Sequence, residues 1–248
     1  MIRCSIVTAC FILGSFELNA QISLPGTSYT QDFDLIGSGL PDGWSVRTSA
    51  GADSFGTAAS FNSTPTAWNA TDSGGTFRNI ESNDTTRALG WRPVGNNSAE
   101  VTPNRTGAIM LSLQNTVGWT NFSLSFDLFR ANDVGGNQSY QFEYRVGDSG
   151  IFTQLGATFE TDSMTLAGQT VAFSEPTLTS VANQSDSVYF RLRGVSTAGS
   201  SDLDTIGLDN FNLTYSAIPE PSTYGLIFGL GALGVAGVRR FRDRRRQA

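Results

Sequence analysis

Few side chains in this sequence could carry out catalysis. The 248 residues include no histidine, so neither a Ser-His-Asp triad nor a histidine-ligated zinc site can form. Carboxylates remain, and a glycosidase needs only two of them. Asp127 and Glu143 fall on the polar sides of separate alternating segments, where solvated side chains are the ordinary case. We therefore predict that the protein is not an enzyme.

Tryptophan is the other residue type here with a recognisable chemistry, because its ring face can stack on a sugar ring. Trp68 stands in a stretch rich in Ser, Thr and Asn, and Trp91 lies between Gly90 and Arg92. Neither has the alternating pattern of a strand around it. We therefore predict that both lie in loops and are candidate carbohydrate-binding residues. A position in the core is the alternative.

The C-terminus has the pattern of a membrane anchor. Pro219, Glu220 and Pro221 are followed by an uncharged apolar run over residues 222–238 and then by six arginines. As a helix the run would reach roughly 25 Å, slightly less than a hydrocarbon core of about 30 Å, and the arginines can make up the difference by snorkelling. The positive-inside rule places the arginines in the cytoplasm and the preceding chain outside.

These three parts, in this order at the C-terminus, resemble the PEP-CTERM sorting signal of Gram-negative bacteria. The resemblance implies that residues 218–248 form a sorting and anchor segment. It implies that Pro219, Glu220 and Pro221 are recognised by exosortase, a membrane-embedded cysteine transpeptidase. It further implies an exported protein that is anchored first in the inner membrane and then located at the cell surface or in the extracellular matrix, where exopolysaccharide or other glycans are partners.

The N-terminus predicts export independently. Arg3, an apolar stretch over residues 6–16 and the sequence Leu18-Asn19-Ala20 are typical of a signal peptide, so residues 1–20 are expected to be removed after Ala20. A lipoprotein box ending at Cys10 is the alternative, but only nine residues precede Cys10. Because Cys4 and Cys10 are the two cysteines, the processed chain would contain no disulfide.

The region between the two targeting segments is acidic and undivided. Residues 21–218 contain 19 acidic residues and nine arginines, a net charge of −10, which argues against nucleic acid or an anionic membrane as a partner. About 200 residues suffice for one core, and no proline-rich or charge-rich break divides them. We therefore predict a single ectodomain at residues 21–217.

Apolar residues in this region recur with a period of two, which is typical of strands with one buried face and one solvated face. The alternating segments are 109–113, 122–128, 140–146 and 188–192. The alternation changes register near Asp209-Asn210, which predicts a bulge. Turn signals separate the segments without amphipathic helices, so we predict an all-β fold, an antiparallel β-sandwich. Residues 45–107 are less regular, and we expect long loops and short strands there.

The ends of the ectodomain resemble the first and last strands of lectin-like jelly rolls of the concanavalin or MAM type. The matching stretches are residues 32–44 and 204–211. The resemblance implies that the terminal strands lie side by side in one sheet and that Asp34 and Asp209 hold a structural calcium ion. Carboxylate oxygens suit calcium. The alternative is that these residues are solvated acids in turns and caps.

Two functions fit these observations. The first is a structural or adhesive protein of the cell surface or exopolysaccharide matrix. The second is a carbohydrate-binding module. A glycoside hydrolase ranks lower, because the Glu-x-Asp-x-x-Glu strand motif of the concanavalin-like glycosidases is absent.

Overall fold

The computed structural model describes residues 21–67, 75–81, 87–93, 106–131, 137–164, 168–174, 177–195 and 204–219. Short 3-10 helices are η1 (Ile36–Ser38), η3 (Thr161–Ser163) and η4 (Thr179–Val181). The strands are β1 (Ser28–Gln31), β2 (Trp44–Thr48), β3 (Thr57–Ala58), β4 (Phe61–Ala67), β5 (Thr76–Glu81), β6 (Arg87–Arg92), β7 (Ala108–Leu113), β8 (Trp119–Arg130), β9 (Ser139–Val146), β10 (Thr153–Glu160), β11 (Gln169–Phe173), β12 (Val188–Val195) and β13 (Ile206–Ala217).

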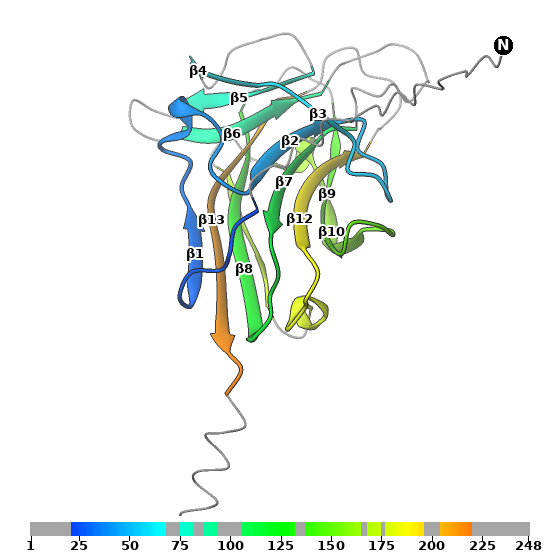
Figure 1. Cartoon of the computed structure of the whole chain (residues 1–248). Helices are drawn as coiled ribbons and strands as arrows, with labels where there is room; N and C mark the ends of the chain where they lie inside the picture. Colours follow the sequence, from blue (N-terminus) through cyan, green and yellow to red (C-terminus); the bar gives the residue numbers. More distant parts are fainter. Residues whose placement is uncertain are drawn as a thin grey trace, which may run out of the picture.

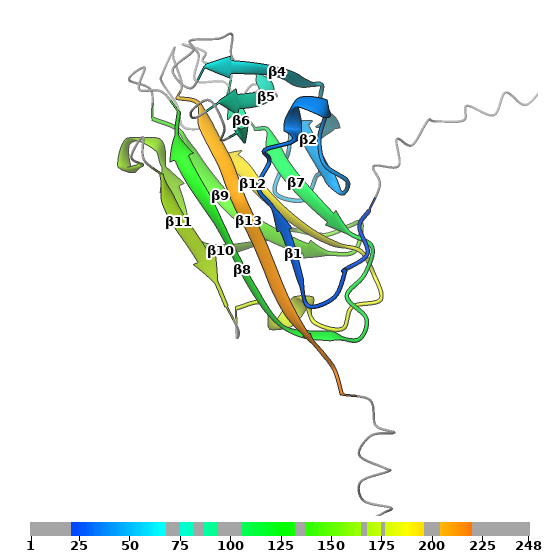
Figure 2. The same cartoon turned by 90° about the vertical axis from the view of Figure 1, so that its left-hand side faces the viewer.

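These strands form two sheets packed face to face, which confirms the predicted β-sandwich (Figures 1 and 2). Sheet B has 7 strands in the order β11-β8-β13-β6-β5-β4, and β1 also pairs with β13. Sheet A has 6 strands in the order β10-β9-β12-β7-β2-β3. Every ladder between these strands is antiparallel except that of β4 with β5, which is parallel.

The alternating segments of the sequence form the central strands of both sheets. On β8, Phe122, Leu124 and Phe126 are no more than 1% exposed. Strands β7, β9 and β12 likewise direct alternate residues into the core, because successive side chains of a strand point to opposite faces, and most of their outward residues are buried as well. One continuous apolar core therefore lies between the sheets.

Strand β13, the last of the chain, lies in the middle of sheet B (Figure 2). It pairs with β8 along most of its length, and its pairing shifts register between Asp209 and Asn212. Asn210 has a φ of 49°, in the left-handed region that asparagine tolerates better than most residues. The predicted bulge is confirmed. The predicted proximity of the terminal strands is confirmed too, because Ser28–Gln31 pair with residues 211–214.

The short strands expected over residues 45–107 are present, while residues 68–74, 82–86 and 94–105 lie outside the described residues. This region contains five strands, β2 to β6, of which β5 and β6 are well buried. Their sequences do not alternate because both faces are buried here: Ile80 and Ala88 lie on the outer face of sheet B together with the buried Arg78 and Arg92. A Cβ on Gly90 would lie 1.9 Å from the Ile80 side chain, and one on Gly207 would lie 1.9 Å from the Phe129 ring. Glycine is required at both positions for these side chains to lie flat on the sheet.

Candidate functional site

The two predicted calcium ligands lie where β13 changes its neighbour. Leu208 pairs with Leu89 of β6, whereas Phe211 pairs with Gln31 of β1. Asp209 lies between these two pairs, at the bulge. The bulge is thus the point at which β13 passes from one partner strand to the next.

Asp34 reaches the same junction from the segment that follows β1. Its Oδ1 accepts a hydrogen bond of 3.3 Å from the backbone N–H of Arg87, the first residue of β6. Its own N–H donates to Asp32 Oδ1 at 3.2 Å, which fixes the turn. The structure therefore brings Asp34 and Asp209 together from opposite ends of the ectodomain.

Asp127 of β8 lies directly opposite Asp209 and adds a further carboxylate. Its Oδ1 accepts from the Thr170 hydroxyl at 2.6 Å, and its Oδ2 accepts from Asn210 Nδ2 at 2.8 Å. The sequence placed Asp127 on a polar strand face but did not connect it with this site. Only the register between β8 and β13 makes that connection.

The environment of this acidic cluster raises the pKa of Asp209. Its side chain is buried, and burial is the main reason that its pKa is raised to about 7. The carboxylates of Asp34, Asp127 and Asp32 raise it as well, while the hydrogen bond from the Asn210 N–H, at 2.7 Å, lowers it. A buried carboxyl beside other carboxylates gains from protonation or from a cation.

The donor chemistry of the cluster suits calcium, since all the side chains offer oxygen atoms. Within the described ranges, however, no three acidic, histidine or cysteine side chains are grouped closely enough to hold a metal ion. Calcium at Asp34 and Asp209 therefore stays a prediction.

The prediction that Trp91 lies in an exposed loop is wrong. Trp91 belongs to β6 and is 0% exposed. Its ring stacks on Phe77 at a centroid distance of 5.4 Å and meets the edge of Tyr140 at 5.5 Å. Because both faces of β6 are buried, the sequence around Trp91 does not alternate between apolar and polar residues. Trp91 is a core residue with no face for a sugar, and Trp68 lies outside the described residues.

The outer face of sheet A also differs from the expectation of a solvated surface. Glu143 of β9 is only 3% exposed, and its carboxylate accepts hydrogen bonds from Arg191 Nε at 2.7 Å and from Arg193 Nη2 at 2.7 Å. Burial lowers the pKa of Arg191 to about 10, so its guanidinium stays charged at neutral pH. Two buried cations share one anion. Arg193 also donates to Gln141 Oε1 at 2.9 Å, and backbone carbonyl groups supply further acceptors for Arg191.

Those carbonyl groups come from residues 51–54, which cross the face of the sheet. Arg191 donates to the carbonyl oxygens of Ser54 and Gly51, each at 2.7 Å. Arg145 donates to the carbonyl of Asp53 at 3.0 Å, and its guanidinium lies 3.9 Å from the ring centroid of Phe55. This part of sheet A is therefore covered by its own chain.

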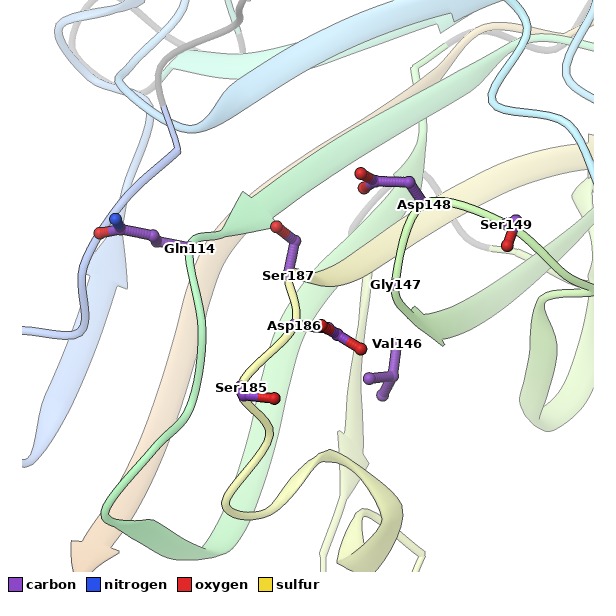
Figure 3. Close-up of a pocket in the computed structure, with 8 residues that line it drawn as sticks. All are labelled: Gln114, Val146, Gly147, Asp148, Ser149, Ser185, Asp186 and Ser187. Atoms are coloured by element: carbon purple, nitrogen blue, oxygen red, sulfur yellow. The ribbon is translucent and has the colours of Figure 1, made fainter.

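An open polar pocket of about 450 Å³ lies beside the turn that connects β9 to β10 (Figure 3). It is lined by Gln114, Val146, Gly147, Asp148, Ser149, Ser185, Asp186 and Ser187. The Tyr189 hydroxyl donates to Asp148 Oδ1 at 2.5 Å, and Gln21 Nε2 donates to Ser187 Oγ at 3.0 Å. No sequence pattern pointed to this pocket, because its walls come from three separate turns.

The sorting tripeptide begins at Pro219, and one residue, Ile218, separates it from the end of β13 at Ala217. Pro219 is described and exposed, while Glu220, Pro221 and the run 222–238 lie outside the described residues, as do residues 1–20. None of the helices in the described ranges is long and apolar enough to cross a membrane.

Comparison with known families identifies the PEP-CTERM protein-sorting motif at residues 217–240. The match confirms the resemblance of the C-terminus and indicates an exported protein that exosortase processes at a membrane. It covers only the C-terminal segment, so it does not describe the ectodomain. Comparison with curated proteins finds no match.

Several solved structures have a similar arrangement of strands. The xylan-binding module CBM15 is 8% identical with a TM-score of 0.45, covering 78% of this chain and 100% of its own. The CBM22-1 xylan-binding domain of Paenibacillus barcinonensis Xyn10C is 11% identical with a TM-score of 0.41, covering 77% of this chain and 95% of its own. The K3 cleaved adhesin domain of Lys-gingipain from Porphyromonas gingivalis w83 is 13% identical with a TM-score of 0.42, covering 76% and 98%. Similarities at this level say nothing about what this chain binds.

Replacing Trp91 tests its place in the core. Trp91→Ala should reduce the free energy of unfolding by about 3 to 5 kcal/mol, because it removes a buried ring and leaves a cavity. Leu35→Ala is the control, since Leu35 is 83% exposed, and it should change stability by less than about 0.5 kcal/mol. Denaturant unfolding measures both. A Trp91→Ala protein as stable as the control would contradict the core assignment.

The raised pKa of Asp209 predicts a pH dependence of stability in the metal-free protein. With a pKa of about 7 in the folded state and 3.8 ordinarily, the folded protein binds the extra proton between these values. This contribution to stability is complete below about pH 4 and is lost as the pH rises through about 7. The wild type should therefore lose more stability between about pH 5 and pH 8 than Asp209→Asn, which cannot titrate. Parallel pH profiles in EGTA would contradict the assignment.

Proposed function

We propose that this chain is an exported protein of the cell surface or extracellular matrix, with a structural or adhesive role and no enzymatic activity. The precursor would be anchored in the inner membrane of a Gram-negative bacterium. Exosortase would then process it at Pro219, Glu220 and Pro221. The observation that carries the proposal is the sorting motif, which starts at Ala217, the last residue of β13. The ectodomain and the processing site are therefore joined without a linker.

The positions of the carboxylates support a role without catalysis. Asp127 and Glu143, the two considered for glycoside hydrolysis, belong to β8 of sheet B and β9 of sheet A. Both are on the outer faces of their sheets, so the whole core lies between them. Two carboxylates must flank the same glycosidic bond to hydrolyse it, and these two cannot.

Glycan binding stays the alternative function. Trp91 does not supply a sugar platform, and residues 51–54 cover part of the outer face of sheet A. What favours the alternative is the pocket of Figure 3, whose serine hydroxyls, Gln114 amide and two carboxylates are groups that hydrogen-bond to sugar hydroxyls. Trp68, which lies outside the described residues, is a further candidate for stacking on a sugar ring. Binding to a glycan array would distinguish this function from a purely structural one.

We also propose that Asp34 and Asp209 bind a structural calcium ion. The support is their convergence at the junction of β1, β6 and β13 and the repulsion among the carboxylates there, which a bound cation would relieve. A secreted domain without disulfides gains stability from such an ion, because only the folded state brings the two ligands together.

Replacing Glu220 tests the processing step. Glu220→Ala should leave an uncleaved, membrane-bound form, because it removes the charged residue of the recognition tripeptide. Ser216→Ala is the matched control, since Ser216 is an exposed residue just before the tripeptide, and it should be processed normally. Electrophoretic mobility and release into the medium measure the outcome. Equal mobility and equal release of Glu220→Ala and the wild type would contradict the processing proposal.

Chelation tests the calcium site. EGTA should lower the melting temperature of the exported protein by several degrees if about 1 to 2 kcal/mol of binding linkage is lost. The double variant Asp34→Asn with Asp209→Asn should show no response to EGTA or to added calcium. A wild-type melting curve that is identical with and without calcium would contradict the calcium site and favour the alternative, in which Asp34 and Asp209 are solvated acids in turns and caps.

A further inference from the structure

Anchoring through residues 222–238 would place the end of the sandwich that carries the sorting segment within a short reach of the membrane. The backbone N–H of Ile218 donates to the carbonyl of Gly118 at 2.8 Å, so the chain is still held by the fold at this residue. The apolar run begins at Ser222. Four residues span at most about 14 Å when fully extended. The headgroup region of one leaflet is roughly 5 to 8 Å thick, so this end of the domain must lie at or next to the headgroups.

Four stretches of chain converge on this end (Figures 1 and 2). They are the turn before β1, the turn between β7 and β8, the segment around η4, and the end of β13. Gly118 donates its N–H to Asn183 Oδ1 at 3.0 Å, and Asn183 donates its N–H to the Trp119 carbonyl at 2.9 Å. The Tyr215 hydroxyl donates to the Pro25 carbonyl at 2.8 Å. These bonds make the end one connected surface.

This surface carries no charge, although the ectodomain is strongly acidic. Residues 21–31, 112–126, 177–185 and 210–219 contain no Asp, Glu, Lys or Arg; we call the end they form the neutral end. The acids that adjoin these ranges are Asp32, Asp127, Asp186, Asp209 and Glu220. Asp186 faces the pocket of Figure 3, and Asp127 and Asp209 lie at the bulge of β13. The negative surface potential of a bacterial membrane would repel a domain with a net charge of −10, but it acts over only about a Debye length. An uncharged end is therefore the one that can approach anionic lipids.

The neutral end also exposes apolar side chains. Val117, at the tip of the turn between β7 and β8, is 55% exposed, and Ile218 is 38% exposed. Trp119 is partly exposed, with its ring against Tyr215 at a centroid distance of 4.8 Å. Tryptophan is enriched at the interface between membrane and water, where an amphipathic ring is stabilised.

We propose that the neutral end rests on the lipid headgroup layer and thereby holds Pro219, Glu220 and Pro221 at the membrane surface. The proposal depends on the proposed anchoring of residues 222–238, and it adds a contact that anchoring alone does not require. Without a linker, the tripeptide is presented to a membrane-embedded enzyme by the domain itself.

The depth of a label at Val117 tests this contact. Cys4 and Cys10 lie in the expected signal peptide, so Val117→Cys would be the only thiol of the exported protein. A nitroxide attached there, with the full exported chain in vesicles of phosphatidylethanolamine and phosphatidylglycerol, should be shielded from a water-soluble relaxation agent. Thr64→Cys is the matched control, since Thr64 is exposed on β4 at the opposite end (Figure 1), and its label should stay accessible.

Three outcomes would overturn the proposal. Equal accessibility of the two labels in vesicles would show that the end does not touch lipid. A disulfide-linked dimer through Val117→Cys would assign the surface to a second copy of the chain. Shielding that occurs only in the presence of exosortase would assign it to the enzyme. The vesicle measurement is made first without exosortase and is then repeated with the enzyme added. The first measurement stands even if the processing proposal fails, whereas loss of the protein from the vesicles would show that the anchoring itself is wrong.

A charge at the same position tests what the contact does. Val117→Asp should weaken the contact, because the membrane surface repels the added charge, and the tripeptide is then presented less often for cleavage. Cleavage, and with it the release of the processed protein, should slow about fivefold, while Thr64→Asp should leave the release rate unchanged. Equal release rates for the two variants would overturn the claim that the contact presents the tripeptide.

Discussion

The pairing of β13 with β8 holds sheet B together, and the acidic cluster and the position of the sorting segment depend on it. β13 is the last strand of the chain, yet it lies between β8 on one side and β6 and β1 on the other. Its inward side chains, such as Leu208 and Phe211, complete the core. Because residues 211–214 must pair with residues 28–31, the sheet cannot close until nearly the whole ectodomain has been synthesised, and such distant contacts are slow to form.

The same strand connects the acidic cluster to the anchor. Its bulge at Asp209 marks the change from β6 to β1, and the change of neighbour leaves room for Asp34 to approach. Eight residues further on, the strand ends at Ala217, where the sorting motif begins. A cation at the bulge would therefore stabilise the strand that carries the processing site, and any fraying of that strand would loosen both.

Sheet A is organised by a different constraint, the burial of charge. Arg191 and Arg193 meet the single carboxylate of Glu143, and removing that carboxylate would leave two buried cations without an anion. Backbone carbonyls of residues 51–54 accept from Arg191 and Arg145, so the segment is bound to the sheet by the need to satisfy these guanidinium groups. This packing closes a surface that alternation alone predicts to be wet.

The sequence by itself determined the strands with one polar face, the bulge near Asp209, and the sorting segment, since each depends on residues close together along the chain. It did not determine the role of Trp91, because a strand buried on both faces has no alternation to distinguish it from an irregular loop. It could not bring Asp127 to Asp209, or residues 51–54 to Arg191, because those contacts are set by strand register and by packing between distant segments. The tertiary structure decided these, and with them which surfaces remain open: an acidic junction on sheet B, a polar pocket beside the β9–β10 turn, and an uncharged end next to the anchor.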